Sequence, residues 1–362
     1  MTLLSGIKVL EIADGLVDFG GRMLAEMGAD VVSVVSEGAR SQDRMLAWHH
    51  GKTRLDGNDR EAVVSLARQA DIILDGQRTG DRFSLGEALG ADTKAIHIRV
   101  IAEQGRAAPA SDLTLMAQSS LMAVTGDPDR PPLRLPGEQA YALTGIQAAT
   151  AALMGLYARG RIGRGQTVEV SARQSATLAS YREAIMYEWT GRIGRRNGNL
   201  LVRGKSGVRQ IWEADDGYVT WSMIDNPPMM RALVAVMGEM GVAGELAHVD
   251  WDNTLVADLP QETIERWQAI VGAFFKSQKK AQLGRWSLQK GWGLSVISTP
   301  VEVRHSEQLA ARGLFVQVTD EATGRKASVP GPLFTSSINQ VPPARTLATP
   351  KPASSFKRWR AK

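Results

Sequence analysis

The 362-residue sequence contains no cysteine, which excludes disulfide bonds, thiolate nucleophiles, iron–sulfur clusters and cysteine-based zinc sites together. Histidine is also scarce, and the histidines show no HExxH spacing, so the sequence does not indicate a metal site. The five histidines are His49, His50, His97, His248 and His305. GxSxG and GxGxxG motifs are missing, which leaves a serine hydrolase of the nucleophile-elbow type and a nicotinamide dehydrogenase without support.

Long apolar runs are missing as well, since no run approaches the ~18 residues that a membrane span requires. The N-terminal segment has no basic region followed by an apolar core, so we expect no secretory leader and a cytoplasmic protein without a membrane partner. The net charge of +5 is dispersed, apart from the basic stretch Lys357–Lys362. Because no nucleic-acid recognition motif accompanies it, the charge favours a polyanionic metabolite over nucleic acid.

The hydrophobic pattern alternates between short apolar strands and amphipathic helices. Apolar strands are predicted at 7–12, 31–35, 71–74 and 95–101, and helices between them at 23–27 and 60–69. Two longer helices are predicted further along the chain, at 144–159 and 171–189. This β-α-β rhythm is typical of a parallel sheet covered on both faces. The predicted fold class is therefore α/β, with a Rossmann-like large lobe.

Composition and turn signals divide the rest of the chain. We expect the large lobe in residues 1–190, a basic, glycine-rich linker in 191–207 and a smaller α+β lobe in 208–297. Short strands return to the large lobe in 298–342, and a basic tail without a regular pattern occupies 343–362. The small lobe is thus predicted as an insertion.

Two short segments carry candidate phosphate contacts. Gly204-Lys205-Ser206 resembles the end of a phosphate-binding loop, but Asn199 stands where that motif needs its first glycine. A polar loop is predicted at His49-His50-Gly51-Lys52. This loop is either only exposed to solvent or binds a phosphate of the ligand through Lys52. Arg78 follows a strand end, the usual ligand position of open α/β sheets.

A set of motifs, in order along the chain, resembles the family III CoA-transferases, the carnitine dehydratase/bile-acid-inducible protein family that includes formyl-CoA transferase and α-methylacyl-CoA racemase. The similar segments are Gly6–Glu11, Gly28–Val32, His50–Lys52, Ala70–Leu74, Gln77–Gly80, Asp112–Gly126, Gly163–Val170, Thr299–Val303, Gln308–Gly313 and Val329–Pro332. No single motif is decisive, but their order makes the resemblance specific. It spans roughly residues 4 to 340.

The resemblance implies a large lobe with a smaller inserted lobe, and two chains interlocked as a dimer. It also implies an acyl-CoA thioester as substrate, no covalently bound cofactor and no metal. Family enzymes use one aspartate as the nucleophile, which attacks the thioester and forms a mixed anhydride. Lys52 and Arg78 are the candidates for contacts with the CoA phosphates.

The sequence departs from the family pattern at the nucleophile. Where the resemblance places the aspartate, just before Thr144-Gly145, this chain has Tyr141, and a phenol with a pKa of ~10 cannot form the anhydride. Glu138 is the nearest carboxylate. In the racemase branch an acid–base histidine corresponds to Ser111, whereas Asp112 is retained. Glu138 and Asp112 are therefore the candidate substitutes for a catalytic group.

Three hypotheses follow. The first is a chain that acts on acyl-CoA thioesters as the nucleophile-deficient subunit of a heteromeric CoA-transferase, paired with a catalytic paralogue. The second is a self-sufficient transferase or racemase-type enzyme that uses Tyr141, Asp112 or Glu138 in a relocated role. The third is a binding relative without catalysis. Two segments that border the family's CoA channel, Arg54–Gly57 and Ala102–Gly105, are shortened here, so CoA binding itself stays open.

Overall fold

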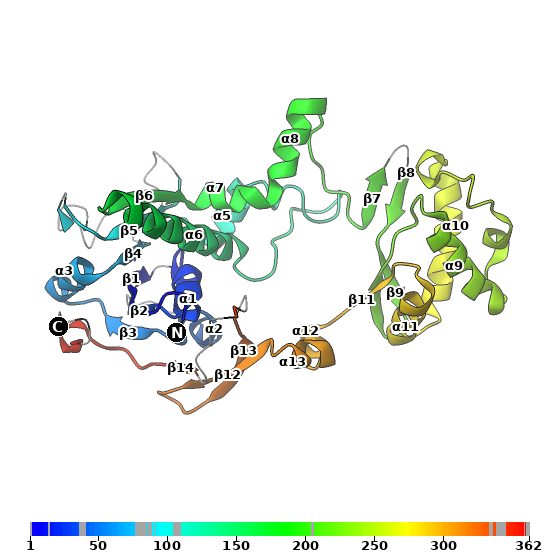
Figure 1. Ribbon diagram of the computed structural model, residues 1–362. Coiled ribbons are helices and arrows are strands. Elements are labelled where there is room, and N and C mark those ends of the chain that lie inside the picture. The colour runs from blue at the N-terminus through cyan, green and yellow to red at the C-terminus, as the bar shows by residue number, and fades with distance from the viewer. Residues whose placement is uncertain are drawn as a thin grey trace. The chain divides into compact units, whose positions relative to one another are not determined.

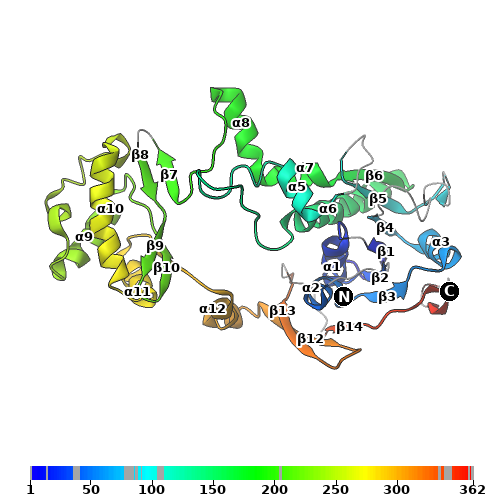
Figure 2. The ribbon, with the colours of Figure 1, turned by 180° about the vertical axis from the view of Figure 1, so that it is seen from behind.

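We describe the protein from a computed structural model, which covers residues 2–13, 15–35, 41–76, 85, 89–90, 92–103, 110–203, 206–332, 336–337, 345–357 and 359. The chain divides into two compact units (Figures 1 and 2). The large unit comprises residues 1–123, 133–194 and 307–362. The small unit comprises residues 124–132 and 195–306.

A seven-stranded parallel sheet forms the centre of the large unit. In spatial order its strands are β15 (Lys351–Pro352), β3 (Thr53–Asp56), β2 (Asp30–Val35), β1 (Lys8–Ala13), β4 (Ile72–Asp75), β5 (Ile96–Ile101) and β6 (Gln166–Ser171). The four predicted strands are all present in it. This confirms the α/β fold class with a Rossmann-like arrangement.

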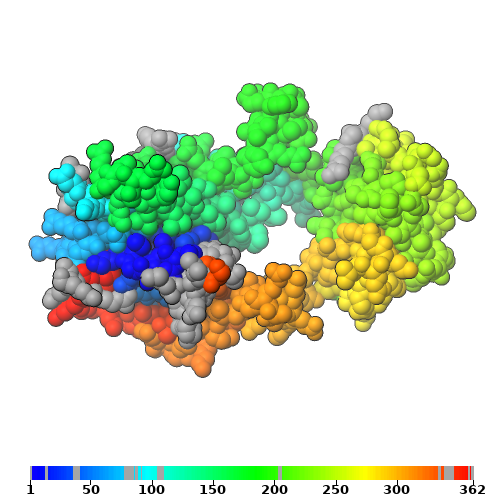
Figure 3. Space-filling model, in the orientation of Figure 1, coloured from blue at the N-terminus to red at the C-terminus, as the bar shows by residue number. Residues whose placement is uncertain are grey.

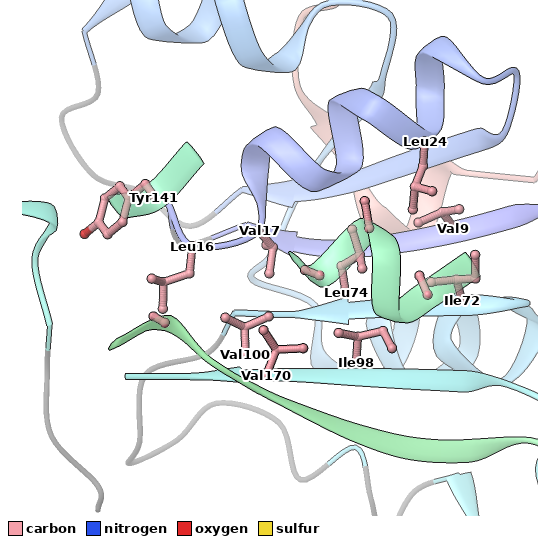
Figure 4. Packing of buried hydrophobic residues seen from close by; sticks show 14 of the residues in the cluster. Val9, Leu16, Val17, Leu24, Ile72, Leu74, Ile98, Val100, Tyr141 and Val170 are labelled. Atoms are coloured by element: carbon pink, nitrogen blue, oxygen red, sulfur yellow. The ribbon is translucent and has the colours of Figure 1, made fainter. Parts of the chain in front are cut away.

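Helices cover both faces of this sheet, which is why its central strands are almost uninterrupted apolar runs. On one face, α1 (Asp18–Glu26) packs against β1 and β2, and α6 (Gln139–Ile162) packs against β5 and β6. Figure 4 shows aliphatic side chains that fill this layer. On the other face, α3 (Arg60–Gln69) packs against a second cluster. A Cβ on Gly20 would lie 2.6 Å from the carbonyl oxygen of Gly145, so these glycines allow α1 and α6 to cross closely.

The small unit is built from antiparallel strands and helices. Its three-stranded sheet has the order β11 (Ser295–Ile297), β10 (Gly217–Thr220) and β9 (Ile211–Ala214), beside the hairpin β7 (Leu200–Arg203) and β8 (Ser206–Arg209). Its helical elements are α9 (Pro227–Glu239), η2 (Gly244–His248), η3 (Val256–Asp258), α10 (Gln261–Lys276), α11 (Lys280–Lys290) and α12 (Pro300–Arg304). Trp212, Trp221, Phe275 and Trp292 are buried together in its core.

The remaining elements belong to the large unit. A small sheet has the order β13 (Lys326–Pro330), β12 (Phe315–Asp320) and β14 (Arg345–Leu347). The other helical elements are α2 (Gln42–His49), α5 (Asp112–Gln118), α7 (Ala172–Thr177), η1 (Leu178–Ser180), α8 (Tyr181–Thr190), α13 (Glu307–Ala311) and η4 (Ala353–Ser355). None of the helices in the described parts of the chain is both long enough and apolar enough to span a bilayer.

The structure differs from the predicted segmentation at several places. Residues 124–132 and 298–306, which are predicted in the large lobe, belong to the small unit. The predicted linker 191–207 contains β7 and the start of β8, because its apolar residues pair in an antiparallel ladder. The predicted irregular tail 343–362 adds β14 and β15 to two sheets. Trp359 in that tail is only 2% exposed, and its indole nitrogen donates to Asp30 Oδ2 at 2.9 Å, so this side chain is part of the core.

Candidate active site

The strand order reverses at β1, where the chain proceeds to β2 and β3 on one side and later to β4, β5 and β6 on the other. Ligands of open α/β sheets bind at such a reversal, outside the carboxyl ends of the strands. Shortly after β1, Gly15 has a φ of +87°, and a Cβ there would lie 2.9 Å from Cε2 of Tyr141. The structure therefore places Tyr141 at the position where this fold binds ligands.

The start of α6 holds Tyr141 in place through Asp112. Glu138 is the N-cap residue of α6, but its side chain makes no capping hydrogen bond. Instead, the backbone N–H of Tyr141 donates to Oδ1 of Asp112 at 3.0 Å. Asp112 is 4% exposed and also lies 3.6 Å from Arg134, so its carboxylate caps the helix from outside the helix.

The Tyr141 side chain is 6% exposed and lies at one end of the apolar cluster. Figure 4 shows it beside Leu16, with its hydroxyl directed away from the other labelled side chains. That hydroxyl donates to the carbonyl oxygen of Ala110 at 3.4 Å. Tyr141 therefore combines an apolar contact at its ring with a polar contact at its hydroxyl.

Arg44 of α2 joins the groups around Tyr141. Its guanidinium carbon lies 5.3 Å from the centre of the Tyr141 ring and 4.8 Å from that of Trp48. Nη1 donates to Glu138 Oε1 at 2.7 Å, and Nη2 lies 3.3 Å from Asp18 Oδ2. One cation thus bridges the half-exposed Glu138 and the fully buried Asp18.

The ionisation of Glu138 reflects this setting. Its burial raises the pKa above the ordinary glutamate value, an effect that Arg44 opposes and that Asp112 and Asp18 reinforce. Glu138 therefore holds a proton more readily than an exposed glutamate does.

Behind Arg44 lies a cluster of fully buried ionisable side chains. Lys52 Nζ pairs with Glu11, at 2.7 Å from Oε2, and donates to the backbone carbonyl of Asp18 at 2.7 Å. His49 Nε2 lies 3.1 Å from Asp18 Oδ2, and His49 Nδ1 lies 3.9 Å from Glu11 Oε1. Ser33 donates to Glu11 at 2.7 Å. Burial raises the pKa of Glu11 to about 7, against the opposing effect of Lys52.

The described residues show no group of three or more histidine, aspartate or glutamate side chains arranged to hold a metal ion.

Comparison with known proteins identifies the family. The model of CoA-transferase family III matches residues 4–353. The chain belongs to CoA-transferase family III. It is 24% identical over 369 residues to the succinyl-CoA:(R)-benzylsuccinate CoA-transferase subunit BbsE of Thauera aromatica, covering 90% of this chain and 86% of that one. It is also 26% identical to a succinate–glutarate CoA-transferase of Agrobacterium fabrum, covering 67% of this chain and 68% of that one.

Solved structures share the fold. A CAIB/BAIF family protein from Brucella suis matches with a TM-score of 0.79 at 23% identity, and the match covers 94% of each chain. Rv3272 from Mycobacterium tuberculosis matches with a TM-score of 0.72 at 18% identity, covering 98% of this chain and 97% of that one.

The family III chain brings three of its five predicted site residues together. Tyr141 and Asp112 share a hydrogen bond, and Glu138 reaches Tyr141 through Arg44. Lys52 lies elsewhere, in the interior, where its ammonium is engaged by Glu11 and Asp18. A contact between Lys52 and a CoA phosphate would require this ion pair to open. Arg78 lies outside the described residues.

The predicted polar loop from His49 to Lys52 is partly wrong. His49 is the last residue of α2, and both His49 and His50 are 0% exposed. The helix forms because Ser41 caps it by accepting from the N–H of Arg44. The buried histidines then face the interior, where His49 Nε2 lies 3.1 Å from Asp18 Oδ2 and the backbone carbonyl of Leu46 accepts from His50 Nδ1 at 2.6 Å.

Four residues in and around this candidate site were not predicted, namely Glu11, Asp18, Arg44 and Trp48. One signal for Glu11 was available, because a single carboxylate interrupts the apolar strand of β1 and a buried charge requires a partner. The sequence offers no comparable signal for Arg44, whose partners are 26 and 94 residues away.

Proposed function

We propose that this chain binds CoA thioesters, lacks the nucleophile of its own site and works as one subunit of a heteromeric CoA-transferase. The observation that carries the proposal is Tyr141, which stands at the start of α6 where the family resemblance expects the nucleophilic aspartate. The Thauera aromatica relative is itself named as a subunit of a CoA-transferase, which supports the subunit role. The cytoplasmic location stays a prediction.

The chemistry of transfer explains why the residue type matters. A carboxylate oxygen attacks the thioester carbonyl, the C–O bond of an anhydride forms, and the C–S bond breaks to release CoA as its thiolate. A phenol has an ordinary pKa of ~10 and is almost wholly protonated at pH 7. An acyl group transferred to it would form an ester, which passes the acyl group on far less readily than an anhydride does. The Tyr141 site is therefore unsuited to the anhydride route.

The two neighbouring carboxylates, Asp112 and Glu138, differ in how readily they could act in place of the missing nucleophilic aspartate. Asp112 is used as the cap of α6, and displacing it would leave the Tyr141 N–H without its acceptor. Glu138 is the more accessible group, with a side chain that is 30% exposed and free of any capping duty. This favours one alternative function, a self-sufficient enzyme in which Glu138 carries the chemistry. A third function, binding without catalysis, has no specific support.

A second chain is part of the proposal, as a homodimer or as a heterodimer with a catalytic paralogue. No residue of α8 is buried, although a helix of ten residues is too short to be stable alone. Large apolar side chains recur along it at helical spacing, and α8 projects from the large unit in Figures 1 and 3. These side chains are Tyr181, Ile185 and Trp189, each at least 50% exposed. Such a stripe is typical of a covered interface.

Assembly gives the first test. Native mass spectrometry of this chain co-expressed with a family III chain that keeps the aspartate is expected to show a stable complex of the two. Because a tryptophan at the centre of an interface contributes about 2 kcal/mol or more, we expect Trp189→Ala to weaken assembly roughly 30-fold. Tyr157→Ala on α6 removes a ring that is 70% exposed and serves as the control. A homodimer that does not bind the second chain would contradict the proposed heterodimer. The mass of a single chain at micromolar protein concentration would contradict both the homodimer and the heterodimer.

Ligand binding gives the second test. Isothermal titration calorimetry with CoA is expected to show binding, and Arg78→Ala is expected to weaken it about tenfold or more, since a charge-assisted contact contributes ~1.5–3 kcal/mol. Arg231→Ala removes one positive charge from the small unit, where Arg231 pairs with Asp252, and should leave the affinity unchanged. The absence of any heat with CoA or its thioesters would contradict the proposed ligand.

A further inference from the structure

The small unit has a surface pocket with a volume of about 620 Å³, which lies where α10 packs against β8 and β9. All of its lining residues belong to the small unit, so it is separate from the site at Tyr141. A volume of this size is typical of pockets that bind small molecules. The pocket is therefore a candidate for a second binding site in this chain.

Small residues on one side of α10 create the hollow. Ala269, Gly272 and Ala273 lie on the same side of the helix and line the pocket. A Cβ on Gly272 would lie 3.5 Å from Cζ3 of Trp212, which is an ordinary van der Waals distance, so the packing does not require a glycine there. The walls of the pocket include three exposed side chains with apolar surface, which are Leu200, Ile211 and Tyr218. The pocket thus offers apolar surface to the carbon body of a ligand.

A buried amide in the pocket has a hydrogen-bond donor without a partner. Gln268 of α10 is 4% exposed and lines the pocket. Its Oε1 accepts from the backbone N–H of Arg209, which fixes the orientation of the amide and leaves Nε2 as the donor. Among the described residues, Nε2 has no acceptor. Because buried polar side chains rarely lack a partner, Gln268 indicates an acceptor on a ligand.

The pocket also has a cation that no carboxylate pairs with. The guanidinium carbon of Arg209 lies 5.0 Å from the centre of the Trp212 ring, and its N–H groups have no hydrogen bond or ion pair within the described part of the chain. The other charged residues of the lining, Glu213 and Lys276, pair with each other at 2.9 Å. A guanidinium over an indole ring keeps its N–H groups available for a planar anion.

We propose that this pocket binds a small monocarboxylic acid with an aromatic or aliphatic body. Its carboxylate accepts hydrogen bonds from Arg209 and from Nε2 of Gln268, and its body packs against Ala269, Gly272 and Ala273 of α10. The single unpaired cation matches one negative charge, and the apolar surface fits a carbon body better than it fits an inorganic anion.

The test is a ¹⁹F NMR titration of 4-fluorophenylacetate with the full chain in the absence of CoA. We expect binding with a Kd of about 1 mM, which is typical of so small a ligand. The amide 4-fluorophenylacetamide has nearly the same shape without the charge. We expect it to bind about tenfold or more weakly, because it loses the charge-assisted contact with Arg209.

Two variants place the ligand in this pocket. Arg209→Gln is expected to weaken binding of 4-fluorophenylacetate about tenfold or more. Gly272→Leu is expected to abolish binding, because the new side chain fills the hollow. Leucine is a better helix former than glycine, so the Tm of Gly272→Leu should not fall. The matched control is Arg266→Gln, which removes one charge from the same helix at a residue that pairs with Glu245 outside the pocket and should leave the Kd unchanged.

Three results would each overturn the inference. The first is no binding of 4-fluorophenylacetate, and the second is equal affinity for the acid and the amide. The third is a Kd that Arg209→Gln changes no more than Arg266→Gln does, a comparison that remains decisive if Gly272→Leu fails to fold. Because CoA is not added and all the lining residues lie in the small unit, such a failure leaves the proposed CoA function standing.

Discussion

Replacing Lys52 by methionine is expected to lower the free energy of unfolding of the large unit by about 3–5 kcal/mol, because it leaves the buried Glu11 carboxylate without its cation. The ammonium is within 2.9 Å of both carboxylate oxygens of Glu11 and also donates to the backbone carbonyl of Asp18. Removing one partner of a buried pair costs more than the pair itself contributes, since the desolvation of the other charge is no longer compensated. Denaturant unfolding of the variant and the unmodified chain measures the loss.

The pH dependence of that loss has a definite sign. In the unmodified chain the pKa of Glu11 is raised to about 7 from 4.5, so the folded state binds the proton more tightly than the unfolded state. The stability from this group is complete below pH 4.5 and is lost as the pH rises through 7. Without Lys52 the carboxylate ionises less readily, so the destabilisation by Lys52→Met is expected to be greater at pH 8 than at pH 6.

Two variants serve as controls for this prediction. The double variant Glu11→Gln with Lys52→Met buries no unpaired charge, and we expect it to recover part of the lost stability. Lys276→Met removes a 70% exposed lysine of the small unit, which pairs with Glu213 at 2.9 Å, and should change the stability little. A loss for Lys52→Met no larger than that for Lys276→Met would contradict the buried pair.

The elements that sequence alone predicts are those with a strong local signal. The apolar strands that became β1, β2, β4 and β5 are runs of aliphatic residues, and the periodicity of such runs needs no knowledge of distant residues. The helix predicted at Thr144–Arg159 is also present, although it is longer and begins at Gln139. That boundary depends on Asp112, a cap supplied by another helix, and no local pattern announces it.

The elements that sequence missed depend on contacts between distant residues. The predicted helix 171–189 is divided into α7, η1 and α8, with the side chain of Ser180 donating to the backbone carbonyl of Ser119 at the break. Likewise, β15 exists because Lys351–Pro352 pairs with β3, far away in the sequence. A two-residue strand has no periodicity of its own, so its place became visible only in the structure.

Three candidate site residues were predicted from their positions along the chain, but the contacts that connect them were not predicted. Tyr141, Glu138 and Asp112 were found by position along the chain, and they do lie together. Arg44, which links them to the interior, lies on a helix whose sequence is too polar to stand out from a loop. The assignment of Lys52 to a phosphate rested on its charge, on a predicted polar loop and on the family resemblance of His50-Gly51-Lys52. The structure instead gives that charge a buried partner in Glu11.

Tyr141→Asp is expected to have the largest effect on chemistry, because it returns a carboxylate to the start of α6. The shorter side chain also vacates the space that the ring occupies against Gly15. Arg44, whose guanidinium carbon is 5.3 Å from the present ring centre, would keep the new carboxylate ionised. We expect this variant to form an anhydride with succinyl-CoA, even where turnover is slow, since a misplacement of ~1 Å can cost about a hundredfold in rate.

The matched control for this variant is Tyr141→Asn, which has the size of aspartate and no nucleophilic oxygen anion. It opens the same space against Gly15 and is expected to form no covalent species. A covalent species in Tyr141→Asn would mean that the opened space, rather than the carboxylate at 141, is responsible.

Hydroxylamine trapping after incubation with succinyl-CoA, read by peptide mass spectrometry, tests most directly whether this chain lacks its own nucleophile. An anhydride is converted to a hydroxamate on the residue that formed it. We expect no hydroxamate in the unmodified chain and a hydroxamate at position 141 in Tyr141→Asp. A hydroxamate on Glu138 of the unmodified chain, abolished by Glu138→Gln and unaffected by Tyr141→Phe, would contradict the proposed lack of a nucleophile and make Glu138 the nucleophile.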